Sequence, residues 1–184
     1  MPSRILSPAN QITILRLLLV PLFAALVLSA RYGWALSVLA AATLSDVADG
    51  LVARYLNQET SFGNALDPIA DKILLVTGFL ILSSQQVLPW WLSILVLTRD
   101  LGILTTALLI NLIAGFRPFN PSMFGKASTV SQMSVLLVAL AAETTLARFA
   151  TPLKTPCIYL AAALTLLSGV HYLIFWREYS RAKA

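Results

Sequence analysis

Residues 46–71 read DVADGLVARYLNQETSFGNALDPIAD, which sets four aspartates between two apolar stretches. Asp46 and Asp49 are three residues apart, and Asp67 and Asp71 are four residues apart. Side chains at these spacings share one face of an α-helix. We therefore expect two neighbouring helices, one ending and one beginning within this stretch, that direct four carboxylates toward one polar cavity.

The composition of the whole chain is that of a membrane protein. Of its 184 residues, 58% are hydrophobic and only 11% are charged, against about 25% charged residues in soluble domains. These figures argue against a water-soluble domain and a disordered chain, and the net charge of +5 comes without the basic face of a nucleic-acid-binding protein. Cys157 and His171 are each the single residue of their kind, so neither an intrachain disulfide nor a zinc–thiolate cluster is expected.

Six apolar stretches are candidates for helices that cross the hydrocarbon core, which takes about twenty residues. They cover residues 11–30, 34–54, 63–82, 90–114, 127–142 and 156–176, with short connections that are rich in proline, glycine and polar residues. The sequence therefore predicts an all-α integral membrane protein with six transmembrane helices, built as a single domain over residues 1–184.

Lysine and arginine at the ends of these stretches predict the orientation. With the N-terminus in the cytoplasm, seven basic residues lie on the cytoplasmic side: Arg4, Arg54, Arg117, Lys126, Arg177, Arg181 and Lys183. Three lie on the other side: Arg31, Arg148 and Lys154. Both termini and the aspartate stretch are therefore expected to face the cytoplasm.

A fifth aspartate, Asp100, also falls inside a predicted span, and each unpaired aspartate at mid-bilayer costs roughly 2.5 to 3.5 kcal/mol. The five aspartates outnumber the three cations within the spans, Arg16, Lys72 and Arg99, by two. Carboxylates that meet repel each other unless cations lie between them, and oxygen ligands favour hard ions such as Mg²⁺ or Mn²⁺. The sequence thus predicts a site for two divalent cations that binds a pyrophosphate-containing substrate.

The same stretch satisfies the pattern D-x2-D-G-x2-A-R-x8-G-x3-D-x3-D at all eight fixed positions within 26 residues. It resembles the CDP-alcohol phosphotransferases, membrane enzymes of phospholipid synthesis. The resemblance extends to the segments at 8–16, 66–72 and 125–132, and so covers nearly the whole chain. It implies a six-helix fold, usually a homodimer, that transfers a phosphatidyl group from CDP-diacylglycerol to an acceptor hydroxyl with release of CMP.

The resemblance also implies roles for individual residues. Asp46, Asp49 and Asp67 are expected to bind two divalent cations, and Asp71 is expected to be the general base and a further metal ligand. The residues expected to contact CDP and its pyrophosphate are Thr13, Gly50, Ala53, Arg54 and Gly63. Those expected to bind the acceptor are Arg99, Arg117 and Lys126. The implied location is a bacterial inner membrane, with the active site facing the cytoplasm.

The segment around Asp67 and Asp71 resembles two branches of the family, which differ in acceptor. Phosphatidylglycerophosphate synthases use glycerol 3-phosphate and typically carry Arg-Glu with a further arginine two turns on, whereas this chain has Arg99-Asp100 and Ala107. We therefore favour the cardiolipin synthase branch, whose acceptor is phosphatidylglycerol, with glycerol 3-phosphate as the alternative. A cation-coupled transporter is a remote alternative because neither inverted repeats nor broken helices are visible. A catalytically inactive paralogue is disfavoured because all motif positions are filled.

Overall fold

The computed structural model describes the backbone of residues 8–56, 63–114 and 123–181, and the side chains of 16–45, 72–105 and 123–172. This part of the chain is all-helical, as predicted. Its six helices are α1 Pro8–Leu28, α2 Tyr32–Leu56, α3 Gly63–Ser84, α4 Trp90–Ala114, α5 Met123–Ala142 and α6 Ala147–Arg181. The predicted bounds of the first four spans agree with these helices to within three residues.

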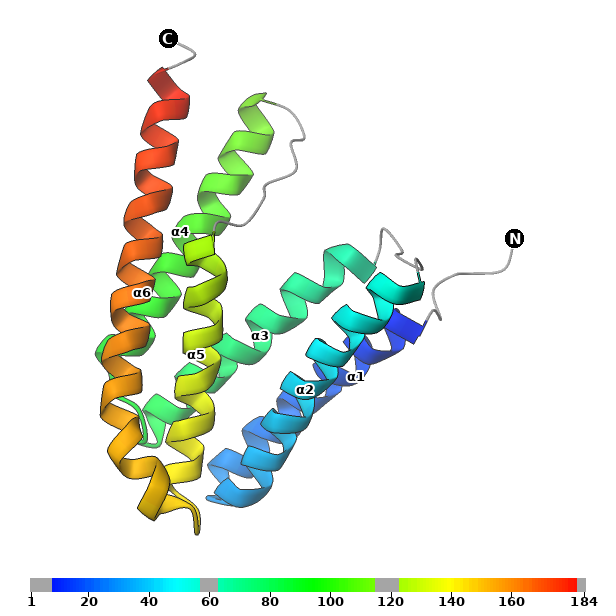
Figure 1. Ribbon diagram of the computed structural model, residues 1–184, viewed down its shortest axis with the longest axis vertical. Coiled ribbons are helices and arrows are strands. Elements are labelled where there is room, and N and C mark those ends of the chain that lie inside the picture. Colours follow the sequence, from blue (N-terminus) through cyan, green and yellow to red (C-terminus); the bar gives the residue numbers. More distant parts are fainter. Residues whose placement is uncertain (1–7, 57–62, 115–122, 182–184) are drawn as a thin grey trace.

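The helices run alternately up and down in a bundle (Figure 1). α1 packs against α2 and α3, α5 packs along α6, and α4 packs against α6. α3 also contacts α4 and α5 and so links the two halves of the bundle. The end of α2 and the start of α3 lie at the same end of the bundle as the start of α1 (Figure 1).

The last helix begins earlier than the sequence predicts. The sequence predicts an apolar span over residues 156–176, after a connection that runs from Arg148 to Pro156. An interior proline removes a helical hydrogen bond and costs about 3 kcal/mol. In the structure α6 begins at Ala147 and contains both Pro152 and Pro156. Ala150 is buried in this additional segment, whereas the partly exposed Lys154–Glu143 ion pair, with Nζ and Oε1 3.2 Å apart, adds little stability. Tertiary contacts thus extend the helix through two residues that disfavour it.

Two tight turns connect helices at the opposite end of the bundle. α1 ends where Ala30 takes a φ of 54°, and the amide of Arg31 donates to the carbonyl of Leu26 over 2.9 Å. α3 ends in the same way at Gln86, with a φ of 59°, and the amide of Val87 donates to the carbonyl of Leu82. Such left-handed residues satisfy the last carbonyls of a helix and turn the chain back. The connections between helices are therefore short and fixed at this end.

The core lies where α3 crosses the middle of the bundle. Phe79 of α3 is fully buried with Phe23 of α1 and Leu136 of α5. A Cβ atom at Gly78 would lie 2.8 Å from Cδ1 of Leu136, closer than side chains tolerate. Gly78 therefore allows α3 and α5 to approach closely, as small residues do in membrane helix packing.

The outer surface of the bundle is apolar. Trp34, Trp90 and Trp91 are exposed near one end, and several leucines of α4 and α6, with Val170 of α6, are exposed between them and the other end. Within the part of the chain whose side chains are described, two helices, Met123–Ala142 and Ala147–Tyr172, are long and apolar enough to cross a membrane, and only 22% of the second is buried. An apolar helix that is mostly exposed suits a lipid environment rather than a soluble core. Six spans and the cytoplasmic termini stay predictions.

Candidate active site

The motif of the sequence lies on two helices joined by residues 57–62. Asp46 and Asp49 belong to the last three turns of α2, and Asp67 and Asp71 belong to the first three turns of α3. Both pairs therefore lie in helical backbone, where residues three or four positions apart share one face. The side chains of these four residues lie outside those that the structure describes, as do Thr13, Gly50, Ala53, Arg54 and Gly63. Their roles stay predictions.

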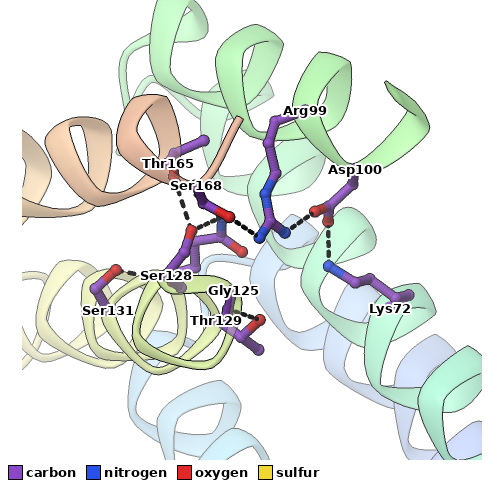
Figure 2. A network of polar contacts seen from close by, with 10 residues as sticks. Lys72, Arg99, Asp100, Gly125, Ser128, Thr129, Ser131, Thr165 and Ser168 are labelled. Carbon is purple, nitrogen blue, oxygen red and sulfur yellow. Dashed lines mark hydrogen bonds and ion pairs between the residues drawn. The ribbon is translucent and has the colours of Figure 1, made fainter. Parts of the chain in front are cut away.

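Directly after the motif, a charged cluster joins three helices (Figure 2). The ammonium of Lys72 on α3 donates to Oδ2 of Asp100 on α4 over 2.5 Å, and Nη1 of Arg99 donates to Oδ1 of the same carboxylate over 2.7 Å. Nη2 of Arg99 donates to Oγ of Ser168 on α6 over 2.5 Å. Asp100 thus lies between two cations, and its charge is neutralised within the protein.

Burial differs across this cluster. The side chains of Arg99 and Asp100 are only 7% and 9% exposed, whereas that of Lys72 is 40% exposed. Two cations and one carboxylate leave the cluster with a charge of +1. Charges with so little exposure are stable only when they are paired and hydrogen-bonded. The Arg99–Asp100 pair therefore forms the buried centre of the cluster, although Nε of Arg99 has no hydrogen-bond partner among the described residues, and Lys72 reaches the pair from the more exposed side.

A second, uncharged group ties α5 to α6 beside the first. Oγ of Ser128 lies 3.2 Å from Oγ1 of Thr165, and Nε2 of Gln132 donates to both oxygens. All three residues are fully buried. Ser168 lies one turn after Thr165 on α6, so the two groups are adjacent along that helix (Figure 2). Thr165 and Ser168 are not among the residues predicted from the sequence, although their spacing of three in an apolar helix is a usable signal.

The structure describes two of the three predicted acceptor-binding residues. Lys126 is exposed in the first turn of α5, whereas Arg99 is buried and bonded to Asp100 and Ser168. Arg117 lies outside the described residues. An arginine has five N–H groups, so Arg99 would have to contact an acceptor with those left over or exchange its present partners.

Two further regions bear on the choice of site. Among the described residues no group of three histidines, cysteines, aspartates or glutamates lies close enough to hold a metal ion, and the motif aspartates are not among them. A shallow hollow of about 440 Å³ lies between the α1–α2 and α5–α6 turns, lined by residues that include Arg31, Trp34 and Glu143. It is at the opposite end of the bundle from the motif. The candidate active site is therefore the end of the bundle where α2 ends and α3 begins.

Comparisons with known proteins show which sequences this chain is similar to. Residues 6–178 match the sequence model of a family described as CDP-alcohol phosphatidyltransferase. A "Probable phosphatidylglycerophosphate synthase" of Mycobacterium tuberculosis is 35% identical over 184 residues, covering 92% of this chain and 81% of that protein. A "Cardiolipin synthase (CMP-forming)" of Streptomyces coelicolor is 35% identical over 137 residues, or 71% of this chain. The match spans 63% of the length of the Streptomyces protein.

Proposed function

Because this chain belongs to the CDP-alcohol phosphatidyltransferase family, we propose that it transfers a phosphatidyl group from CDP-diacylglycerol to phosphatidylglycerol, forming cardiolipin and releasing CMP. The family match over residues 6–178 carries the reaction class. The residues of the motif at 46–71 are all present, which supports an active enzyme rather than an inactive paralogue.

We propose that the four motif aspartates hold two Mg²⁺ or Mn²⁺ ions. The donor set fits such ions, because carboxylate oxygens without histidine or cysteine suit hard cations. The position of both helix segments at one end of the bundle supports a shared site (Figure 1). When bound, the ions would polarise the phosphoryl group and stabilise the charge of the departing CMP. Asp46, Asp49 and Asp67 are the proposed ligands.

Asp71 is the proposed general base and a further ligand. Its carboxylate accepts the proton of the acceptor hydroxyl while that oxygen forms a bond to the lipid-side phosphorus. The bond from this phosphorus to the oxygen of CMP breaks, and CMP leaves with the electron pair. Thr13, Gly50, Ala53, Arg54 and Gly63 are proposed to hold the CDP moiety, with the small residues admitting it close to the backbone.

The state of Arg99 supports phosphatidylglycerol as the acceptor. A water-soluble acceptor such as glycerol 3-phosphate has a nearly dianionic phosphate. Arginine and lysine side chains would have to supply most of the affinity for it. Arg99 already donates to Asp100 and Ser168, whereas Lys126, another of the proposed acceptor-binding cations, is exposed. Phosphatidylglycerol is concentrated by the membrane, and its single phosphodiester charge needs fewer cations.

The protein is membrane-associated, as its family is. We propose that it resides in the inner membrane of a bacterium, crosses it six times and presents the active site to the cytoplasm. The exposed apolar surface of α4 and α6 supports lipid contact on these helices. A homodimer is the proposed assembly.

The proposal is tested with purified protein in detergent–lipid micelles. CDP-diacylglycerol is offered with phosphatidylglycerol or with glycerol 3-phosphate, and CMP and the lipid products are quantified with Mg²⁺, with Mn²⁺ and after chelation. We expect metal-dependent CMP release and cardiolipin formation with phosphatidylglycerol. Saturable formation of phosphatidylglycerophosphate at sub-millimolar glycerol 3-phosphate, without cardiolipin, would show that the acceptor is the alternative one. Absence of CMP release with any acceptor, together with cation flux in proteoliposomes, would favour the transporter.

A further inference from the structure

We propose that Asp100 is a positioning residue: by holding the Lys72 ammonium, it fixes the rotation of α3 and with it the part of the active site that α3 carries. This inference rests on the proposed function, because it gives the rotation of α3 a catalytic consequence. Its structural basis is the cluster of Figure 2, in which Asp100 accepts hydrogen bonds from Lys72 and from Arg99 at 2.5 and 2.7 Å.

The place of Lys72 in the sequence makes this contact consequential. Lys72 directly follows Asp71, and Asp67 precedes it by five residues on the same helix. Each residue of an α-helix is turned by about 100° from the previous one, because a turn contains 3.6 residues. A lysine that is ion-paired with a residue of α4 therefore restrains the rotation of the preceding turns of α3. A rotation of that segment would move the motif residues relative to those on α2.

The tie is effective because Asp100 itself is held firmly. The Arg99–Asp100 pair is almost fully buried, and Arg99 is bonded through Nη2 to Ser168, which has no exposed surface. The chain of contacts thus runs from α3 through α4 to α6. The Lys72 side chain is 40% exposed, and among the described residues the buried carboxylate of Asp100 is what holds its ammonium.

This role differs from that of a charge near the reaction. If the positive charge of Lys72 alone mattered, its removal would lower activity, whereas neutralising Asp100 would not. Asp100→Asn keeps an oxygen for Nη1 of Arg99 but puts an NH₂ group where Lys72 now donates. Lys72→Met leaves the Arg99–Asp100 pair intact, so it avoids an unpaired buried guanidinium. The two variants therefore break the same contact from opposite sides.

The first readout is steady-state kinetics of CMP release by the full-length protein. We expect kcat to fall by on the order of 10²-fold in Lys72→Met and Asp100→Asn, since small misplacements of catalytic groups cost about that much. The KM for CDP-diacylglycerol should stay near the wild-type value. The kcat of the double variant should be no lower than that of the less active single variant. Lys72→Arg, which can still donate to Asp100, should recover most of kcat.

The second readout does not depend on activity. Nitroxide labels at exposed Ile73 on α3 and Leu166 on α6, in a Cys157→Ala background, report the distance distribution between these helices by pulsed electron spin resonance. We expect this distribution to shift or broaden in Lys72→Met and Asp100→Asn. Lys154→Met is the matched control, because it removes another lysine–carboxylate pair, at the α5–α6 turn, and should change neither readout.

The outcomes separate the inference from the proposed function. An unchanged distance distribution in both variants would overturn the positioning role, whatever the kinetics. A loss of kcat in Lys72→Met with full activity in Asp100→Asn would also overturn it and leave a charge effect. Absence of CMP release by the wild-type protein would refute the proposed function. The distance measurement would still test whether the Lys72–Asp100 contact positions α3. If Asp100→Asn does not fold, the distance distribution of Lys72→Met alone decides whether Asp100 positions α3.

Discussion

Ser168→Ala is the substitution that most directly tests the buried cluster. Oγ of Ser168 accepts a hydrogen bond from Nη2 of Arg99 over 2.5 Å, and both side chains are buried. Alanine removes one oxygen atom and leaves the backbone of α6 unchanged. The variant therefore measures how much the Arg99–Ser168 bond stabilises the packing of α4 against α6.

The magnitude follows from the charge of the donor and its burial. A hydrogen bond to a charged group contributes about 1.5 to 3 kcal/mol in soluble proteins, whereas pairs between membrane helices average about 0.6 and reach about 1.7 kcal/mol. Because the donor is a guanidinium that loses contact with its acceptor inside the bundle, we expect a loss near the upper membrane value, about 1.5 kcal/mol. This loss raises the unfolded fraction roughly tenfold.

The assay is reversible unfolding in mixed micelles, followed by circular dichroism or tryptophan fluorescence. Ser134→Ala is the matched control, because its hydroxyl is exposed and donates only to the carbonyl of Val130 on its own helix. We expect this control to change the free energy of unfolding by less than about 0.5 kcal/mol, as surface substitutions do. Equal stabilities for Ser168→Ala and wild type would refute the assignment of Arg99 to this packing role and would favour a role in binding the acceptor.

The remaining predictions concern the reaction. Asp46→Asn, Asp49→Asn and Asp67→Asn should each abolish CMP release and weaken Mn²⁺ binding measured by electron spin resonance, because an amide keeps the shape of the ligand but removes its charge; near wild-type turnover at low Mg²⁺ would contradict the two-metal assignment. Asp71→Asn should lower the rate by about 10²- to 10⁴-fold while CDP-diacylglycerol binding, followed by equilibrium dialysis, largely survives; full activity would remove Asp71 from the mechanism. Lys126→Ala should raise the KM for the acceptor more than that for CDP-diacylglycerol, and an unchanged acceptor KM would exclude Lys126 from the acceptor site.

The sequence predicts the helices well where polar or breaking residues bound them. The fourth helix agrees at both ends, because Pro89 precedes Trp90 and Gly115 follows Ala114. The predicted start of α6 at Pro156 was wrong, because burial of Ala150 in the earlier segment depends on tertiary packing, which local sequence does not encode. A proline in the sequence predicts a helix boundary, and the sequence does not show which tertiary contacts offset its cost.

The same distinction between local sequence and tertiary packing applies to the candidate site. The motif spacing is a local property, and the placement of all four aspartates on helices was predictable from it. The sequence also marked Lys72, Arg99 and Asp100 as charges within spans. It could not show that Asp100 is neutralised by these two cations, since that pairing depends on how α3, α4 and α6 pack. The carboxylate of Asp100 is therefore not among those whose charge the proposed metal ions would have to balance.

The path of the Arg99–Ser168 bond also has a consequence for biosynthesis. Arg99 lies on α4, and Ser168 lies on α6, which is synthesised later. In the proposed six-span topology, a nascent chain that has inserted only α1–α4 can pair Arg99 with Asp100, but it has no α6 to accept the remaining hydrogen bond or to cover the guanidinium. Until α6 is inserted, this topology leaves a polar surface exposed in the membrane. Chains truncated before Ser168 should therefore be preferred substrates for membrane proteases, and pulse–chase turnover of such truncations measures this preference.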